Sequence, residues 1–92
     1  MANYYDLTAR FDTRASFYGK AKLIEDDDFI TLISYDTEIL KQSKSDGKIE
    51  WICQDESCYT LTTNRHINEF LKQFTNEKAK TKSEILKAIK GA

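Results

Sequence analysis

Residues 62–74 read Thr62-Thr63-Asn64-Arg65-His66-Ile67-Asn68-Glu69-Phe70-Leu71-Lys72-Gln73-Phe74, and they divide the chain into a strand part and a helical part. Four apolar residues of this stretch recur at i, i+3, i+4 and i+7: Ile67, Phe70, Leu71 and Phe74. That spacing places them on one helical face and predicts an amphipathic helix over residues 62–74. Thr62 or Thr63 can cap this helix, because a threonine hydroxyl accepts hydrogen bonds from the unpaired N–H groups of the first turn.

The residues before this helix follow the two-residue period of β-strands. Strands are predicted at residues 4–9, 21–24, 29–35, 37–42 and 48–53, with a last short strand at 58–61. Turn signals separate them: the acidic run at residues 25–28, Asp36, and the Asp46-Gly47 pair. In that pair glycine supplies the left-handed geometry of a tight hairpin.

A second helix is predicted at residues 83–90, inside a C-terminal segment of residues 81–90. Thr81 and Glu84 have the spacing of a capping box, and Ile85, Leu86 and Ile89 share one face. Strands followed by helices indicate an α+β fold, namely a small twisted antiparallel sheet of four to six short strands with one or two C-terminal helices packed on it. The 92 residues make a single domain, residues 1–92, with strands mainly in residues 1–61.

The sequence lacks the features of membrane and secreted proteins. No apolar run approaches the roughly 18–20 residues that span a bilayer, and the N-terminus lacks the basic and apolar parts of a signal peptide. We therefore expect a soluble, cytoplasmic protein.

Two cysteines, Cys53 and Cys58, could bridge a hairpin or form half of a metal site. A structural zinc site needs about four ligands, and His66 is the only candidate for a third. For a cytoplasmic protein we expect two reduced thiols. We predict neither a bound metal nor a cofactor.

Charge is unevenly distributed, although the net charge is only −1. Residues 25–57 hold ten acidic side chains against three lysines, whereas residues 71–92 hold six lysines against two acids. An acidic surface can imitate nucleic acid and occupy a basic cleft of another protein, because complementary potentials speed and orient association. Simple solvation of the loops is the alternative. The candidate partner-binding residues are Glu25, Asp26, Asp27, Asp28, Asp36, Glu38, Asp55 and Glu56.

A second candidate site is basic and would bind an anion, a nucleotide or nucleic acid. Its residues are Arg10, Arg14, Tyr18, Lys20, Arg65 and His66. The start of the helix at Thr62 could hold a phosphate, since helix N-termini bind anions. A pI near 5.8 opposes general nucleic-acid binding, which depends on neutralising phosphates.

Catalysis would depend on His66, the only side chain suited to act as a base at neutral pH. Cys58 or a nearby threonine could partner it, but the sequence offers no orienting acid and no oxyanion loop. We therefore predict a non-enzymatic protein with no catalytic residues.

Four sequence words stand out: Tyr4-Tyr5-Asp6-Leu7, Ser16-Phe17-Tyr18-Gly19-Lys20-Ala21, Ser34-Tyr35-Asp36-Thr37, and Tyr59-Thr60-Leu61-Thr62-Thr63-Asn64-Arg65-His66-Ile67-Asn68-Glu69-Phe70. Together they span residues 4–74 and resemble a family of uncharacterised small proteins from phages and prophages of Gram-positive bacteria. The resemblance implies a phage accessory gene without a particular activity. Genes of this size class commonly encode small binders, including inhibitors of host defence such as anti-CRISPR proteins. The acidic turn, the cysteine pair and the lysine-rich tail lie outside the resemblance.

These observations predict a small phage-encoded binding protein that inhibits a host protein, such as a defence nuclease, through its acidic surface in the host cytoplasm. The alternative is a nucleic-acid or nucleotide binder that uses the basic candidate site. A phage structural or assembly component is a third possibility. We expect a monomer or a homodimer, since an unpaired edge strand can pair with a second copy.

Overall fold

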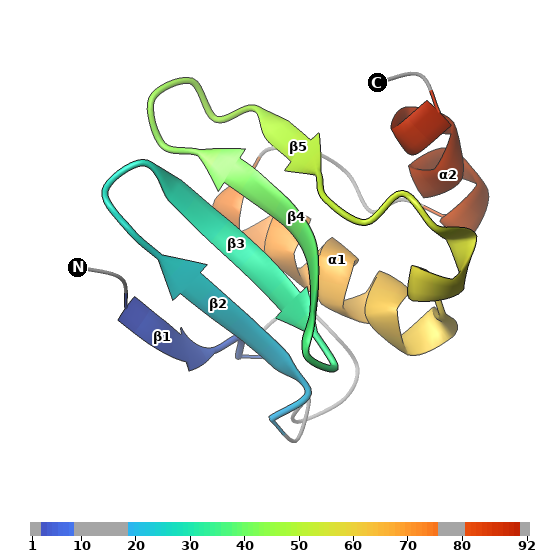
Figure 1. Cartoon of the computed structure of the whole chain (residues 1–92), viewed down its shortest axis with the longest axis horizontal. Coiled ribbons are helices and arrows are strands. Elements are labelled where there is room, and N and C mark those ends of the chain that lie inside the picture. The colour runs from blue at the N-terminus through green and yellow to red at the C-terminus, as the bar shows by residue number, and fades with distance from the viewer. Residues whose placement is uncertain (1–2, 9–18, 76–80, 91–92) are drawn as a thin grey trace.

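The computed structural model describes residues 3–8, 19–75 and 81–90, which form a five-stranded sheet and two α-helices (Figure 1). The strands are β1 (Asn3–Asp6), β2 (Ala21–Glu25), β3 (Phe29–Ser34), β4 (Thr37–Ser43) and β5 (Ile49–Trp51). They are followed by a 3₁₀ turn, η1 (Glu56–Cys58), and by the helices α1 (Leu61–Phe74) and α2 (Lys82–Lys90). Every strand pairs antiparallel with its neighbour in chain order. The predicted α+β class is confirmed.

The core lies between the sheet and α1, which crosses behind it in Figure 1. The predicted apolar face of the helix is the buried one, since Ile67, Phe70 and Leu71 are 0% exposed. Across from it, leucines at positions 23, 32 and 40 stand in register on β2, β3 and β4 and are also buried. Burying one such side chain contributes about 1.5–3 kcal/mol. The sheet and α1 therefore hold each other in place.

Two tight turns join the central strands as predicted. Tyr35 and Asp36 connect β3 to β4 with φ values of 50° and 69°, so both adopt the left-handed conformation of a two-residue hairpin. Gly47 has φ 75° in the turn between β4 and β5. There the Lys48 N–H donates to an Asp46 carboxylate oxygen at 3.0 Å. This bond lowers the pKa of Asp46 below its ordinary value of 3.8.

The predicted strand at residues 58–61 is wrong. The Asp55 carboxylate accepts from the Ser57 N–H at 2.9 Å, and the Cys58 N–H donates to the Asp55 carbonyl at 3.1 Å. These bonds fold the segment into η1. The predicted first strand at residues 4–9 is correct for residues 4–6 but too long, because β1 ends at Asp6, and Ala9 lies outside the described residues.

The cap of α1 differs from the prediction. The helix begins at Leu61, and Thr60 caps it by accepting from the Thr63 N–H at 3.2 Å. Thr63 itself is buried, and its hydroxyl lies 3.0 Å from the Ser34 hydroxyl. It is therefore used for packing against β3.

The expectation of two reduced thiols is also wrong, because Cys53 and Cys58 form a disulfide. The reason is η1, which turns the chain back and brings the two Cα atoms to 6.7 Å, within reach of a disulfide. Next to it, the Tyr59 hydroxyl donates to the Cys53 carbonyl. Burial raises the pKa of Tyr59 to about 12, so this hydroxyl keeps its proton at physiological pH.

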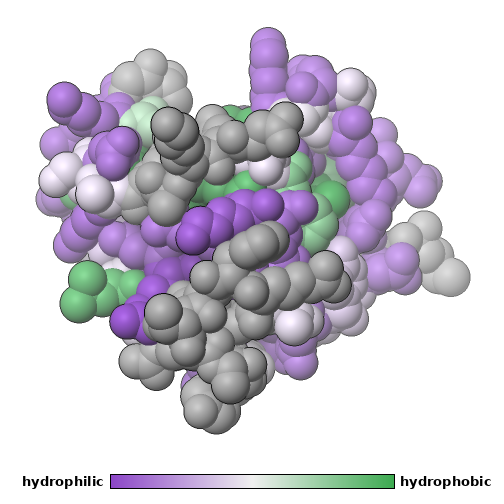
Figure 2. Space-filling view, turned by 180° about the vertical axis from the view of Figure 1, so that it is seen from behind, coloured by the Kyte–Doolittle hydropathy of each residue, from purple (hydrophilic) through white to green (hydrophobic). Residues whose placement is uncertain are grey.

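α2 begins with the predicted capping box. The Thr81 N–H donates to the Glu84 carboxylate at 3.0 Å, and the Glu84 N–H donates to the Thr81 hydroxyl at 3.3 Å. Ile85 and Ile89 are its buried residues. Where Figure 2 colours the residues on the side behind the sheet, hydrophilic side chains are the more common, and apolar residues show between them. Within the described ranges, no helix has both the length and the apolar character required to cross a bilayer.

Candidate functional site

The face of the sheet opposite α1, here called the outer face, is toward the viewer in Figure 1 and carries no described helix. A row of paired residues crosses it from β1 to β5: Tyr4, Ile24, Thr31, Lys41 and Glu50. These positions alternate with the buried leucines, because neighbouring side chains on a strand point to opposite faces. The row therefore points away from the core. Tyr4 is 57% exposed.

A shallow hollow of about 490 Å³ lies at the β3–β5 side of this face. It is lined by three carboxylates, one lysine and five uncharged residues. The lining residues are Asp26, Glu38, Glu50, Lys41, Phe29, Thr31, Trp51, Ile52 and Gln54. With every acid ionised, they carry a net charge of −2. We call this set the acidic hollow.

Lys41, the cation among these lining residues, is already engaged. Its ammonium nitrogen lies 3.2 Å from a Glu50 carboxylate oxygen and 4.3 Å from the centre of the Phe29 ring. The ring face attracts a cation electrostatically. In the described part of the chain, the ion pair of Lys41 is with Glu50 and not with Asp26 or Glu38. In the acidic hollow a carboxylate and an aromatic face thus already hold one cationic side chain, and the carboxylates of Asp26 and Glu38 also line it.

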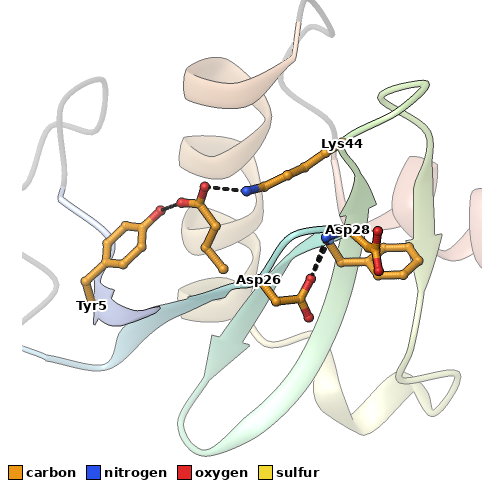
Figure 3. A network of polar contacts seen from close by, with 6 residues as sticks. Tyr5, Asp26, Asp28 and Lys44 are labelled. Atoms are coloured by element: carbon orange, nitrogen blue, oxygen red, sulfur yellow. Dashed lines mark hydrogen bonds and ion pairs between the residues drawn. The ribbon is translucent and has the colours of Figure 1, made fainter. Parts of the chain in front are cut away.

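The acidic turn between β2 and β3 is held by the carboxylate of Asp26. One Asp26 carboxylate oxygen accepts from the N–H groups of Phe29 and Asp28, both at 2.8 Å. These bonds lower the pKa of Asp26, with the Phe29 bond contributing most. Figure 3 shows Asp26 turned toward this backbone. Asp26 thus fixes the turn while it borders the acidic hollow.

Glu25 is held by two partners from other strands. Its carboxylate accepts from the Lys44 ammonium at 2.6 Å and from the Tyr5 hydroxyl at 2.9 Å, so Tyr5 and Lys44 converge on it in Figure 3. The Lys44 bond is the main cause that lowers the pKa of Glu25. Burial, followed by the bond to Glu25, raises the pKa of Tyr5. Glu25 therefore ties β1 and the β4–β5 turn to the end of β2.

The predicted acidic residues do not form one surface. Residues 25–28 lie at one end of the sheet, and Asp36 lies in the turn at the other end of β3. Asp55 and Glu56 lie at η1, where Asp55 accepts from Ser57, a bond that lowers its pKa. Of the predicted set, Asp26 and Glu38 come together in the acidic hollow. Asp27 and Asp28 are exposed beside it.

Glu50 is a residue of the acidic hollow that the sequence-based candidate set missed. It alternates with Ile49 and Trp51 in β5, which indicates that it is exposed. Its place beside Lys41 depends on the register of β4 against β5. The sequence of either strand alone does not specify how the two strands pair.

The basic candidate residues are spread out or lie outside the described ranges. Arg10, Arg14 and Tyr18 fall in the part of the chain that the structure does not describe. Lys20 is exposed and borders a hollow of about 370 Å³ with Lys22 and Tyr35. Arg65 is exposed on α1, whereas His66 is 1% exposed. The two neighbours therefore do not share a surface.

His66 belongs to a buried polar cluster under β3. Its Nδ1 atom lies 2.8 Å from the Ser34 hydroxyl, and that hydroxyl also contacts Thr63. The Tyr35 ring lies 5.8 Å from the His66 ring, centre to centre. Ser34 and Thr63 are 2% and 3% exposed. The cluster fastens α1 to the end of β3.

Among the described residues, no group of three or more His, Cys, Asp or Glu side chains could hold a metal ion.

Stability should fall in acid because of the carboxylates that hold the turns. Asp26, Asp46 and Asp55 have pKa values below their ordinary 3.8 in the folded state. Their contribution is therefore present above about pH 4 and is lost as the pH falls through the lowered values. We expect the melting temperature, followed by circular dichroism, to drop between about pH 4 and pH 2.

A matched pair of variants isolates this effect. Asp26→Asn cannot ionise and should lower the melting temperature at pH 7 while flattening the acid-side slope. Asp27→Asn, one residue away, removes neither of the bonds to Phe29 and Asp28 and should behave as the unaltered chain. Equal slopes in all three proteins would contradict the role given to Asp26.

A family model described as a family of unknown function (DUF8033) matches residues 5–87, and the chain belongs to this family. The matched range includes every residue of the acidic hollow. No curated protein and no solved structure matches the chain. The family description names no activity.

Proposed function

We propose that this member of the DUF8033 family is a small non-enzymatic binding protein that docks the outer face of its sheet on a basic surface of another protein. The observation that carries the proposal is the acidic hollow, in which Asp26, Glu38 and Glu50 surround an already paired Lys41. A carboxylate-rich surface speeds and orients association with a cationic partner.

An arginine-rich partner fits this surface best. Guanidinium groups bind carboxylates through two parallel hydrogen bonds and also stack on aromatic rings. Glu38 and Glu50 supply the carboxylates, and the face of Phe29 already holds a cation in the form of Lys41. Exposed Ile52 adds an apolar contact.

Nucleic-acid clefts of nucleases and related effectors are basic surfaces of this kind, since they neutralise phosphates. A host defence nuclease is therefore the partner class that we propose, with this chain as its inhibitor in the cytoplasm of the host cell. The proposal includes a phage origin, which is supported by the resemblance of the motifs in residues 4–74 to phage proteins. Direct binding of nucleic acid is less well supported, because the acidic hollow would repel phosphates.

The proposal predicts that charge reversal inside the acidic hollow weakens binding more than the same change elsewhere. A fluorescent octa-arginine peptide serves as the probe, and its anisotropy reports binding at physiological salt. Glu38→Lys and Glu50→Lys should each lower the affinity by roughly five- to tenfold, because each removes an attraction and adds a repulsion.

Glu56→Lys is the matched control. It changes the net charge by the same amount, and Glu56 is exposed but does not line the acidic hollow. Its effect should stay within about twofold, the size expected of a screened surface charge. Lys41→Gln should raise the affinity, since it removes the positive charge from the site. If Glu38→Lys and Glu56→Lys lowered the affinity equally, binding would depend on the net charge of the protein and not on the acidic hollow. That result would overturn the proposal.

Identification of the partner follows with the same variants. A tagged chain is incubated with host lysate, with and without nuclease, and the bound proteins are identified by mass spectrometry. A host protein that survives nuclease treatment, and that Glu38→Lys releases but Glu56→Lys retains, would name the partner. Recovery of nucleic acid, with protein lost after nuclease, would instead favour the basic candidate residues.

A further inference from the structure

One wall of the acidic hollow is formed where the chain leaves the sheet. β5 ends at Trp51, and the next two lining residues are Ile52 and Gln54. The last backbone bonds to β4 come from the N–H groups of Ile52 and Cys53, which both donate to the Ile39 carbonyl, at 2.8 and 3.3 Å. Cys53 therefore stands between the two lining residues at the point where pairing with the sheet stops.

Two contacts hold this segment beyond β5. One is the disulfide from Cys53 to Cys58 in η1. The other is the Tyr59 hydroxyl, which donates to the Cys53 carbonyl. Tyr59 is 0% exposed, and its ring meets the Trp51 ring edge-on at 6.3 Å. The tyrosine is thus fixed in the core, whereas the disulfide is the contact that a reductant can remove.

We infer that the Cys53–Cys58 disulfide is a redox-controlled cross-link that sets the affinity of the acidic hollow for its basic partner. When it is closed, it fixes Ile52 and Gln54 in the positions that line the hollow. When it is opened, both side chains gain freedom that partner binding has to remove, so the affinity falls. This inference rests on the proposed function, because it concerns the regulation of the same surface.

The chemistry is ordinary thiol–disulfide exchange with a dithiol reductant. One thiolate of the reductant attacks a sulfur of the disulfide, forms a mixed disulfide and releases the other cysteine as a thiolate, which takes up a proton. The second thiol of the reductant then attacks the mixed disulfide and releases the second cysteine. The protein gains two electrons and two protons, and the reductant leaves as a disulfide. Cys53 and Cys58 are half-buried, so an approach from solvent is open.

The position of the cross-link limits its effect to this region. The two cysteines are five positions apart in sequence, and the constraint that a disulfide places on the unfolded chain is smallest for short loops. The Tyr59 bond and the Trp51–Tyr59 contact involve neither of the two sulfur atoms, so we expect both to persist when the disulfide opens. Reduction should therefore loosen residues 52–58 without unfolding the sheet.

The test compares the oxidised and the dithiothreitol-reduced full chain in the octa-arginine anisotropy assay. Reduction should weaken binding by roughly tenfold, the size expected when two lining side chains are no longer held in place. The Cys53→Ser/Cys58→Ser double variant should bind like the reduced chain and should not respond to dithiothreitol. Circular dichroism in each state checks that the fold persists.

A second readout makes failure of this inference distinguishable from failure of the proposed function. Hydrogen exchange at the amides of Ile52 and Cys53 should accelerate on reduction, while exchange at the core positions Leu32 and Leu40 should not. If the oxidised chain binds the peptide through Glu38 and reduction changes neither affinity nor exchange, the redox inference is wrong and the proposed function stands. If the oxidised chain does not bind the peptide, the proposed function fails and this inference fails with it.

Discussion

Replacing Phe70 with alanine should destabilise the protein by about 3–5 kcal/mol, the cost of removing a fully buried phenylalanine and leaving a cavity. Phe70 is 0% exposed and belongs to the core that joins α1 to the sheet. A domain of 92 residues has a total stability of roughly 5–14 kcal/mol. The variant should therefore lose between about a fifth and nearly all of this stability. Urea titration followed by the fluorescence of Trp51, the only tryptophan, measures the loss.

Phe74→Ala is the matched control for this prediction. Phe74 lies one turn further along α1, with its ring 4.9 Å from that of Phe70, but it is only half-buried. Its loss should cost about 1–1.5 kcal/mol, because less apolar area returns to water. If both variants lost the same stability, the core would not be centred on the residues assigned to it.

Replacing His66 with alanine should cost about 3 kcal/mol, because it leaves a cavity and removes one of the two partners of the buried Ser34 hydroxyl. The Ser34 hydroxyl lies 2.8 Å from His66 Nδ1, and both side chains are at most 2% exposed. Ser34→Ala should cost about 1–2 kcal/mol by leaving the other members of the cluster without this partner.

The double variant distinguishes a structural from a ligand-binding role for His66. Ser34→Ala/His66→Ala should lose about 1 kcal/mol less than the sum of the single variants, because the two residues stabilise each other. The single variants that stay folded should bind the octa-arginine peptide normally, since His66 lies beneath the opposite face of the sheet from the acidic hollow. Additive losses, or a loss of peptide binding by a folded His66 variant, would contradict this assignment.

Local sequence patterns were sufficient for most secondary structure because their signals are local. The spacing of Ile67, Phe70 and Leu71 defined the buried face of α1, and each of them is in the core. The turn at Asp46-Gly47 and the capping box of Thr81 and Glu84 each involve only three or four consecutive residues. Both can therefore be predicted from the local sequence. The strand predicted at residues 58–61 does not form, because the Asp55 carboxylate accepts from the Ser57 N–H and turns the chain just before these residues.

The sequence by itself determined the strand and helix pattern, the acidic character of the middle segment and the class of the fold. Tertiary structure alone decided which charges meet. Arg65 and His66 are adjacent, but successive residues of a helix are turned by about 100°, so one faces solvent and the other β3. Asp26, Glu38 and Glu50 come from a turn and two strands and meet around Lys41 through antiparallel register. Register depends on pairing between distant segments, and no single segment of the sequence contains that information.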